Sequence, residues 1–323
     1  MHPTREKHSF FWILAALALA VAVNVPRVSA QENWHATTKY VNCDLGDTIT
    51  GQLGFVNPGD TIIISGTCNE NLLVNGRTGN YNGVTLDGQG TATISGPDPT
   101  LNVIELTGVS AFTIRGLTIT GGNDGLSINT GSVIAIDTVV VQNTGRHGIH
   151  FQRGSTMGYV VNSTIQNNPQ HGIVINENSN VRVGFTDGVG ASQGNIGPCV
   201  IQGNGGYGIR IQRSASARIY TNTISNNASN GINIESASYA EIATNVIDGN
   251  GKNGIAVSED STLHLGNPNG NKNEDQPNTT NVPNGQFGLS ASWGSYVSGR
   301  MGTLNGTSGA SSFTHGANSN LTP

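Results

Sequence analysis

Charged residues are scarce in this 323-residue chain: they make up 11% of the total, and only four of them are lysines. Lysine and glutamate support exposed helices, so their scarcity argues against a helical protein. The formal net charge of −5 leaves no positive surplus to neutralise nucleic-acid phosphates, so we expect no nucleic-acid partner. Cysteine occurs three times, and no Cys or His spacing resembles a zinc site.

Long apolar runs are also absent, apart from Phe10–Val23 near the N-terminus. This run follows a basic start and precedes the small-residue sequence Val28-Ser29-Ala30, a pattern typical of a secretory signal peptide. We predict a signal peptide at residues 1–30, and therefore a protein that is secreted, periplasmic or on the cell surface. After cleavage we expect no association with a membrane, because no other segment is apolar enough to cross one.

Glycine and asparagine are abundant instead, with 45 and 39 residues. A pattern of Gly-apolar-x-apolar recurs at Gly125, Gly148, Gly172, Gly208, Gly231 and Gly254. The steps are 23 or 24 residues, except for one step of 36, where we expect an insertion within Gly184–Asn195. Seven residues before the last five glycines lie Val141, Ile165, Ile201, Ile224 and Ile247. Four residues before the last four lie Asn168, Asn204, Asn227 and Asn250.

Such a repeat, with short apolar strands and Asn- or Gly-rich turns, predicts a parallel β-helix. One coil cannot bury its apolar face alone, but stacked coils can. We expect the Asn column to form a ladder in which each side-chain amide bonds the next. Over about residues 60–265 the pattern resembles the right-handed parallel β-helix proteins of the pectin-lyase-like superfamily. This resemblance implies an all-β, single-stranded, right-handed solenoid.

We predict a single domain with an N-terminal cap at residues 31–60, the β-helix at 61–265, and a loop with a C-terminal cap at 266–323. Trp34 and Trp293 fall in the caps and are expected to pack there. Cys43 and Cys68 are 25 residues apart, close to one repeat, so we expect them to meet on successive coils and form a disulfide. Cys199 is expected to be a small residue in a packed turn. We expect a monomer.

Polar side chains gather at matching positions of the middle coils, where stacked strands lie about 4.8 Å apart. Three of the eight histidines and six of the eleven arginines lie between residues 140 and 220. The position before the first four repeat glycines holds Asp124, His147, His171 and Tyr207. In the middle coils the second position after the glycine includes His150 and Arg210, and the fifth includes Arg153 and Arg213. We interpret this set as a basic stripe suited to a long anionic ligand.

The stripe and the family resemblance make an acidic polysaccharide, built from uronates, the predicted partner. Lyases and C5-epimerases of such polymers first remove the proton beside the carboxylate, which needs a base and a positive group nearby. The candidate catalytic residues are His147, His171 and Tyr207 as bases, with Arg153 and Arg210 as ligands of the carboxylate. The candidate substrate-binding residues are Asp124, Arg146, His150, Gln152, Gln212 and Arg213.

Several motifs of related enzymes are missing. Polygalacturonase-like hydrolases carry clustered aspartates, which only Asn123-Asp124-Gly125 remotely matches, and the Asp-Pro-His motif of alginate-epimerase-like enzymes is absent. No acidic cluster supports a Ca²⁺ site, so we predict no metal and no other cofactor. The alternative is therefore a non-catalytic surface, adhesive or structural β-helix protein whose polar stripe is ordinary surface.

Overall fold

A computed structural model describes residues 35–154, 158–186, 196–266 and 276–322 of the chain. The predicted signal peptide and most of the predicted insertion lie outside these residues. The helices of the described part are one 3-10 turn, η1 (Cys43–Leu45), and one short α-helix, α1 (Ile49–Leu53). No helix in these ranges has the length and apolarity needed to cross a membrane.

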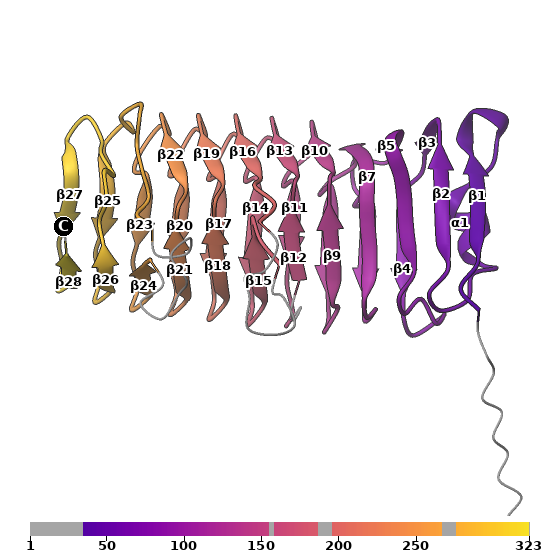
Figure 1. Cartoon of the computed structure of the whole chain (residues 1–323), viewed down its shortest axis with the longest axis horizontal. Helices are drawn as coiled ribbons and strands as arrows, with labels where there is room; N and C mark the ends of the chain where they lie inside the picture. Colours follow the sequence, from indigo (N-terminus) through magenta and orange to yellow (C-terminus); the bar gives the residue numbers. More distant parts are fainter. Residues whose placement is uncertain (1–34, 155–157, 187–195, 267–275, 323) are drawn as a thin grey trace, which may run out of the picture. The chain divides into compact units, whose positions relative to one another are not determined.

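The strands form two sheets along the solenoid, and Figure 1 shows that each coil lies beside the coil that precedes it in the sequence. The ten-stranded sheet contains β4 (Leu72–Asn75), β6 (Ile104–Thr107), β8 (Leu126–Asn129), β11 (Ile149–Phe151), β14 (Ile173–Asn176), β17 (Ile209–Gln212), β20 (Ile232–Ile234), β23 (Ile255–Val257), β25 (Phe287–Ala291) and β27 (Gly309–Phe313).

The 18-stranded sheet contains the remaining strands, two for most coils. They are β1 (Thr38–Asn42), β2 (Thr61–Ser65), β3 (Thr67–Asn69), β5 (Thr85–Gly96), β7 (Phe112–Gly121), β9 (Ile134–Asp137), β10 (Val140–Gln142), β12 (Gly158–Val161), β13 (Thr164–Gln166), β15 (Asn180–Val183), β16 (Val200–Gln202), β18 (Ser216–Tyr220), β19 (Thr223–Ser225), β21 (Tyr239–Ala243), β22 (Val246–Asp248), β24 (Thr262–Leu265), β26 (Tyr296–Arg300) and β28 (Asn318–Thr322).

The register of these strands confirms the predicted repeat. Ile149 of β11 pairs in parallel with Leu126 on one side and Ile173 on the other, so residues after successive repeat glycines lie side by side. The glycine itself is required by the stacking. A Cβ on Gly208 would lie 2.6 Å from the carbonyl oxygen of Gly231 in the next coil, so a side chain would push the coils apart.

The core is a continuous stack of aliphatic side chains inside the coils. Ile201, Ile224 and Ile247, which the repeat predicted to stack, are fully buried on β16, β19 and β22. Burying one such side chain contributes about 1.5–3 kcal/mol. Because each coil covers the next, this contribution depends on the whole stack rather than on one coil.

The predicted asparagine ladder is present and extends one coil further, to Asn284. The side-chain amide of each Asn donates to the side-chain oxygen of the next at 2.9 Å, through Asn168, Asn204, Asn227, Asn250 and Asn284. A second ladder, Asn222 to Asn245 to Asn278, has bonds of 3.0 and 2.9 Å. These bonds satisfy polar groups that the stacked coils bury.

We expect Asn227→Ala to lower the free energy of unfolding by about 2–3 kcal/mol. The substitution removes the acceptor of two Asn204 donors, the side-chain amide at 2.9 Å and the backbone N–H at 3.2 Å. Urea unfolding measures the loss, and Asn180→Ala, at an exposed strand position that pairs with Ser216, is the matched control. Equal effects of the two substitutions would contradict a stabilising ladder.

The parallel pairing continues beyond residues 61–265, the predicted limits of the β-helix. On the N-terminal side β1 pairs with β2, and on the C-terminal side β26, β27 and β28 each add to the stack. The segments predicted as caps therefore carry coils of their own. The glycine pattern missed them because these coils keep the apolar strands without the full repeat motif.

The structure contains the predicted disulfide between Cys43 and Cys68, whose Cα atoms are 5.0 Å apart. It joins η1 to β3 at the start of the solenoid. Cys199 is a free, fully buried thiol, and burial raises its pKa to about 12. It is therefore a packing residue, as predicted.

Candidate active site

The strand register places the predicted stripe on the outer face of the ten-stranded sheet. His150 lies directly between Ser127 and Val174, and Arg210 follows Val174 on the next coil. Asp124, His147, His171 and Tyr207 come just before these strands. The sequence thus assigned the columns correctly, but the role of each side chain depends on its hydrogen bonds.

Asp124 lies beneath the surface and is fully buried. Its carboxylate accepts bonds from Nε and Nη2 of Arg146 at 2.8 and 2.5 Å, from the backbone N–H of His147 at 3.1 Å, and from Nδ1 of His150 at 3.2 Å. Burial alone would raise the pKa of Asp124, but the bonds from Arg146 and His150 hold it well below its usual range. Asp124 therefore stays ionised and orients its neighbours instead of contacting a ligand.

His147 and His171 form part of a ladder between coils. Nδ1 of His147 accepts the backbone N–H of His171 at 3.3 Å, and Nδ1 of His171 accepts the backbone N–H of Tyr207 at 2.9 Å. In later coils the side-chain oxygens of Asn230 and Asn253 accept equivalent N–H groups. The rings of His147, His171 and Tyr207 stack in series, with centroids 4.9 and 4.8 Å apart.

Burial sets the charge of both ladder histidines, and the hydrogen bonds set their tautomer. Burial lowers the pKa of His147 to about 3 and that of His171 to about 4, the charge of Arg210 adding to the second effect. Both rings are neutral at neutral pH, and because Nδ1 accepts a bond, the proton is on Nε2. They are thus hydrogen-bond donors, and the sequence-based choice of His147 and His171 as bases does not fit this geometry.

His150 has the opposite tautomer. Its Nδ1 lies 3.2 Å from the ionised Asp124, so Nδ1 carries the proton and donates it. Nη2 of Arg146 lies 3.4 Å from the same atom and, as a donor itself, cannot take that proton. Nε2 of His150 is buried and has no hydrogen-bond partner in the described part of the chain, and in the neutral ring it is an acceptor. A carboxylate behind an imidazole, with a vacant lone pair in front, is the arrangement of a general base.

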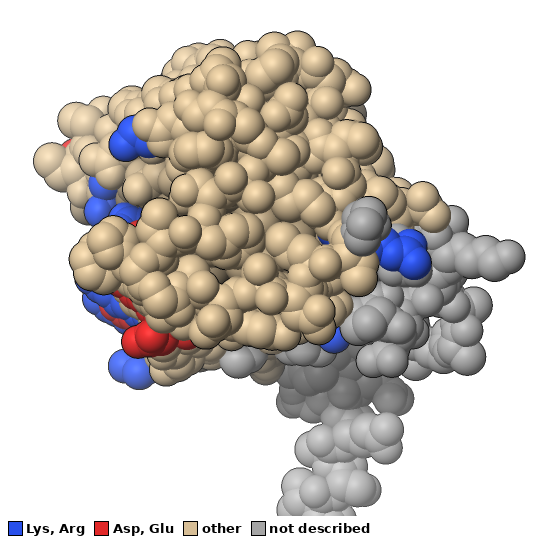
Figure 2. All heavy atoms as spheres, turned by 90° about the vertical axis from the view of Figure 1, so that its left-hand side faces the viewer, with Lys and Arg blue, Asp and Glu red and all other residues tan. Residues whose placement is uncertain are grey.

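The arginines of the stripe are mostly paired, which corrects the expectation of a free basic stripe. Arg146 binds Asp124, Arg210 binds Glu235, and Arg213 binds Glu177 at 3.2 Å. In the end-on view of Figure 2, blue and red atoms lie side by side at the lower left, whereas a blue group at the upper left is surrounded by tan atoms. Arg153 is exposed in the turn after β11 and has no side-chain partner among the described residues.

Glu235 is a site residue that the sequence analysis missed. It accepts Nε of Arg210 at 2.7 Å and the side-chain amide of Asn233 at 2.8 Å. Glu235 stands four residues after its repeat glycine, as Gln152 and Gln212 do, so extending that column by one coil would have revealed it. Arg210 also lies over the Tyr207 ring, 5.8 Å from its centroid, and is thus held from two sides.

The sequence matches a family described as "Right handed beta helix region" over residues 102–269 and 183–291, more than half of the chain. The chain belongs to this right-handed β-helix family. Among curated proteins none matches the sequence. The resemblance to pectin-lyase-like β-helix proteins is therefore confirmed at the level of the fold.

Solved structures resemble this right-handed β-helix protein at low sequence identity. Pectate lyase Pel9A is 11% identical with a TM-score of 0.55, over 89% of this chain and 77% of that one. The A-module of the mannuronan C-5 epimerase AlgE4 from Azotobacter vinelandii is 12% identical with a TM-score of 0.48, over 89% and 87%. An alginate lyase from Paenibacillus sp. str. FPU-7 is 16% identical with a TM-score of 0.46, over 87% and 99%.

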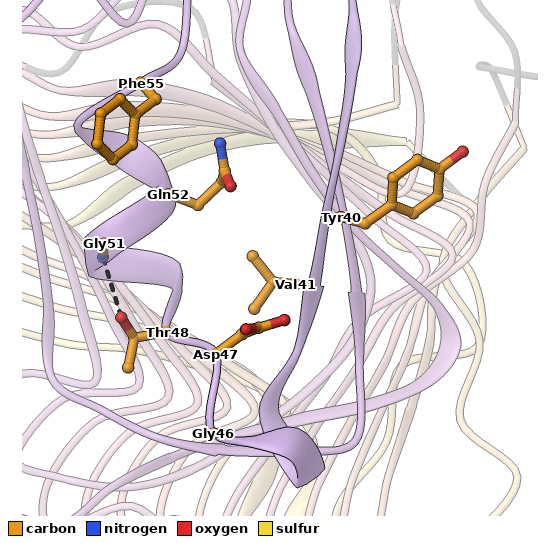
Figure 3. Close-up of a pocket in the computed structure, with 8 residues that line it drawn as sticks. All are labelled: Tyr40, Val41, Gly46, Asp47, Thr48, Gly51, Gln52 and Phe55. Carbon is orange, nitrogen blue, oxygen red and sulfur yellow. Dashed lines mark hydrogen bonds between the residues drawn. The ribbon is translucent and has the colours of Figure 1, made fainter.

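Other hollows of the β-helix lie away from the stripe. A pocket of about 350 Å³ lies between α1 and β1, lined by residues that include Tyr40, Gln52 and Phe55. Figure 3 shows the Tyr40 ring extending from β1 away from α1, so the two aromatic side chains do not converge. A pocket of about 190 Å³ lies on the 18-stranded sheet, where Arg218 pairs with Glu241 at 2.9 Å.

Side chains of the metal-binding type gather in one place within the described ranges, at Cys43, Cys68 and Glu70. Because the two sulfurs form the disulfide, they offer no thiolate to a metal. The two carboxylate oxygens of Glu70 cap α1 instead, accepting the N–H groups of Ile49 and Thr50 at 2.7 and 3.0 Å. The disulfide and Glu70 therefore stabilise the first coils of the solenoid and do not form a metal site.

Proposed function

We propose that this protein binds an acidic polysaccharide across the coils from Asp124 to Arg213 and removes the C5 proton of a uronate residue. The observation that carries the proposal is the contrast among three adjacent histidines. His147 and His171 present Nε2–H donors, whereas His150 presents an unoccupied Nε2 lone pair and is oriented by buried Asp124. Proton abstraction beside a carboxylate requires a base that takes the proton and hydrogen-bond donors that stabilise the negative charge that develops.

In the proposed reaction His150 Nε2 takes the C5 proton. In a lyase the electron pair forms the C4–C5 double bond, the glycosidic C4–O bond breaks, and the leaving oxygen takes a proton. In an epimerase a proton returns to C5 from the opposite face. The candidate proton donors are Nε2–H of His171, one coil beyond His150, and the hydroxyl of half-buried Tyr207, whose ring stacks on His171 one coil further on. Arg153 is the proposed ligand of the substrate carboxylate.

The proposed base, His150, is almost completely buried. His150 is 8% exposed, and its Nε2 is shielded from solvent, so a substrate has to displace neighbouring side chains to reach it. Shielding also strengthens the interaction with Asp124, because water does not screen it. The similarity to a pectate lyase supports the choice of a uronate polymer as the class of substrate to test.

The test is to incubate the protein with pectate, alginate, hyaluronan and chondroitin in D₂O. Ultraviolet absorbance of unsaturated uronate reports elimination, and NMR reports deuterium at C5, which proton exchange or epimerisation introduces. We expect one of the two signals with at least one polymer, and its loss in His150→Asn. If no polymer gains either signal, the catalytic proposal fails.

Binding without turnover is the second candidate, and the pairing of Arg146, Arg210 and Arg213 with acids favours it. Paired arginines weaken the attraction of a long anionic ligand, and the ladder explains His147 and His171 by structure alone. Retention of a polymer on the immobilised protein, lost on raising the salt concentration and unaccompanied by either chemical signal, would support this candidate.

A further inference from the structure

A further pocket lies near the C-terminal end of the ten-stranded sheet, several coils from His150. The pocket, of about 520 Å³, is lined by Glu259, Asp260, Trp293, Gly294 and His315. Val257 pairs with Ala291, and Ala291 with Phe313. The residues two positions further on, Glu259, Trp293 and His315, therefore form a column on three successive coils.

The aromatic part of the pocket is a stacked pair. Trp293 is 59% exposed, which contradicts the expectation that it packs inside a cap. Its indole lies parallel to the His315 ring, with centroids 4.5 Å apart and an angle of 8° between the planes. His315 covers one face of the indole, so the other face looks along the column toward the coil of Glu259.

Two carboxylates, of Glu259 and Asp260, lie on the side of the indole that His315 leaves uncovered. A Cβ on Gly294 would lie 2.2 Å from Oδ1 of Asp260, so the Asp260 carboxylate fills the space that a side chain at position 294 would occupy. Glu259 accepts the Ser236 hydroxyl at 2.7 Å through Oε2, which leaves Oε1 for a ligand. Within the described ranges neither carboxylate has a Lys, Arg or His partner.

We propose that Glu259, Asp260 and Trp293 bind the ammonium group of an organic cation. An aromatic face attracts a cation through its quadrupole, and two unpaired carboxylates add a favourable charge. The same charge repels an acidic polymer, so this site does not rest on the function proposed for the stripe.

Indole fluorescence of the full chain tests the proposal, with two sources of the ammonium group as probes. Glucosamine represents an amino sugar and Nα-acetyl-lysinamide a lysine side chain. N-acetylglucosamine is the uncharged control. We expect a saturable fluorescence change with one or both cations, its loss in Trp293→Leu, and none with N-acetylglucosamine.

Affinity should fall at least about tenfold in the double variant Glu259→Gln, Asp260→Asn. Glu177→Gln, at the equivalent turn position of an earlier coil, should bind as the wild type does, and thermal unfolding verifies that every variant is folded. The proposal is overturned if neither cation saturates, if N-acetylglucosamine binds equally well, or if the folded double variant retains wild-type affinity.

Discussion

Turnover of the uronate polymer should fall about 1000-fold in His150→Asn, the magnitude typical of losing a general base. The variant removes the only imidazole of the described stripe whose Nε2 is an acceptor. Asparagine suits the fold at this position, because Asn233 occupies the same outward column. Single-turnover measurements at saturating polymer separate the chemical step from binding.

His171→Asn is the matched comparison for this prediction. Asparagine keeps an acceptor for the Tyr207 N–H, as Asn230 does for Asn253, and removes the imidazole with its Nε2–H. We expect its effect on the chemical step to be at least tenfold smaller than that of His150→Asn. If folded His150→Asn keeps turnover close to that of the wild type, then His150 is not the base; an equal loss in His171→Asn would instead assign its Nε2–H as the proton donor.

Much of the fold could be predicted because a solenoid converts sequence spacing into spatial register. Once the glycine step was known, Ile165 had to stack on Ile201, and Asn204 had to lie next to Asn227. The disulfide followed from the same arithmetic, since 25 residues is close to one coil. The second asparagine ladder was missed because its members, such as Asn222 and Asn245, lie in a turn that the glycine pattern does not mark.

The candidate site could be predicted only as columns of residues. Spacing places His147 beside His171, but it does not say which ring nitrogen accepts a bond. That depends on the backbone N–H of the following coil, and for His150 on Asp124, which approaches from the preceding coil. The charge of the stripe was misjudged for a related reason. Arg210 pairs with Glu235, 25 residues away, and Glu235 lies outside residues 140–220, the segment in which the charged residues were compared.

The two ladder histidines should also make the protein sensitive to acid. An imidazole in the unfolded chain binds its proton near the ordinary value of 6.5, whereas the pKa is about 4 for folded His171 and about 3 for folded His147. As pH falls from 6.5 toward 4, the unfolded state binds more protons than the folded state, so stability decreases. One pKa unit corresponds to about 1.4 kcal/mol, so the combined effect should exceed that of most single substitutions.

Thermal unfolding between pH 7 and pH 4.5 measures this loss. In His171→Asn the melting temperature should fall less over the same range, because asparagine accepts the Tyr207 N–H without titrating. His35→Asn, at an exposed position, should retain the full wild-type loss. Asp124 acts in the same direction only at lower pH: its pKa is below the ordinary value of 3.8 in the folded protein, so its contribution is present above that value and disappears as pH falls further. A loss between pH 7 and pH 4.5 that is unchanged in His171→Asn would therefore mean that His171 does not contribute to it.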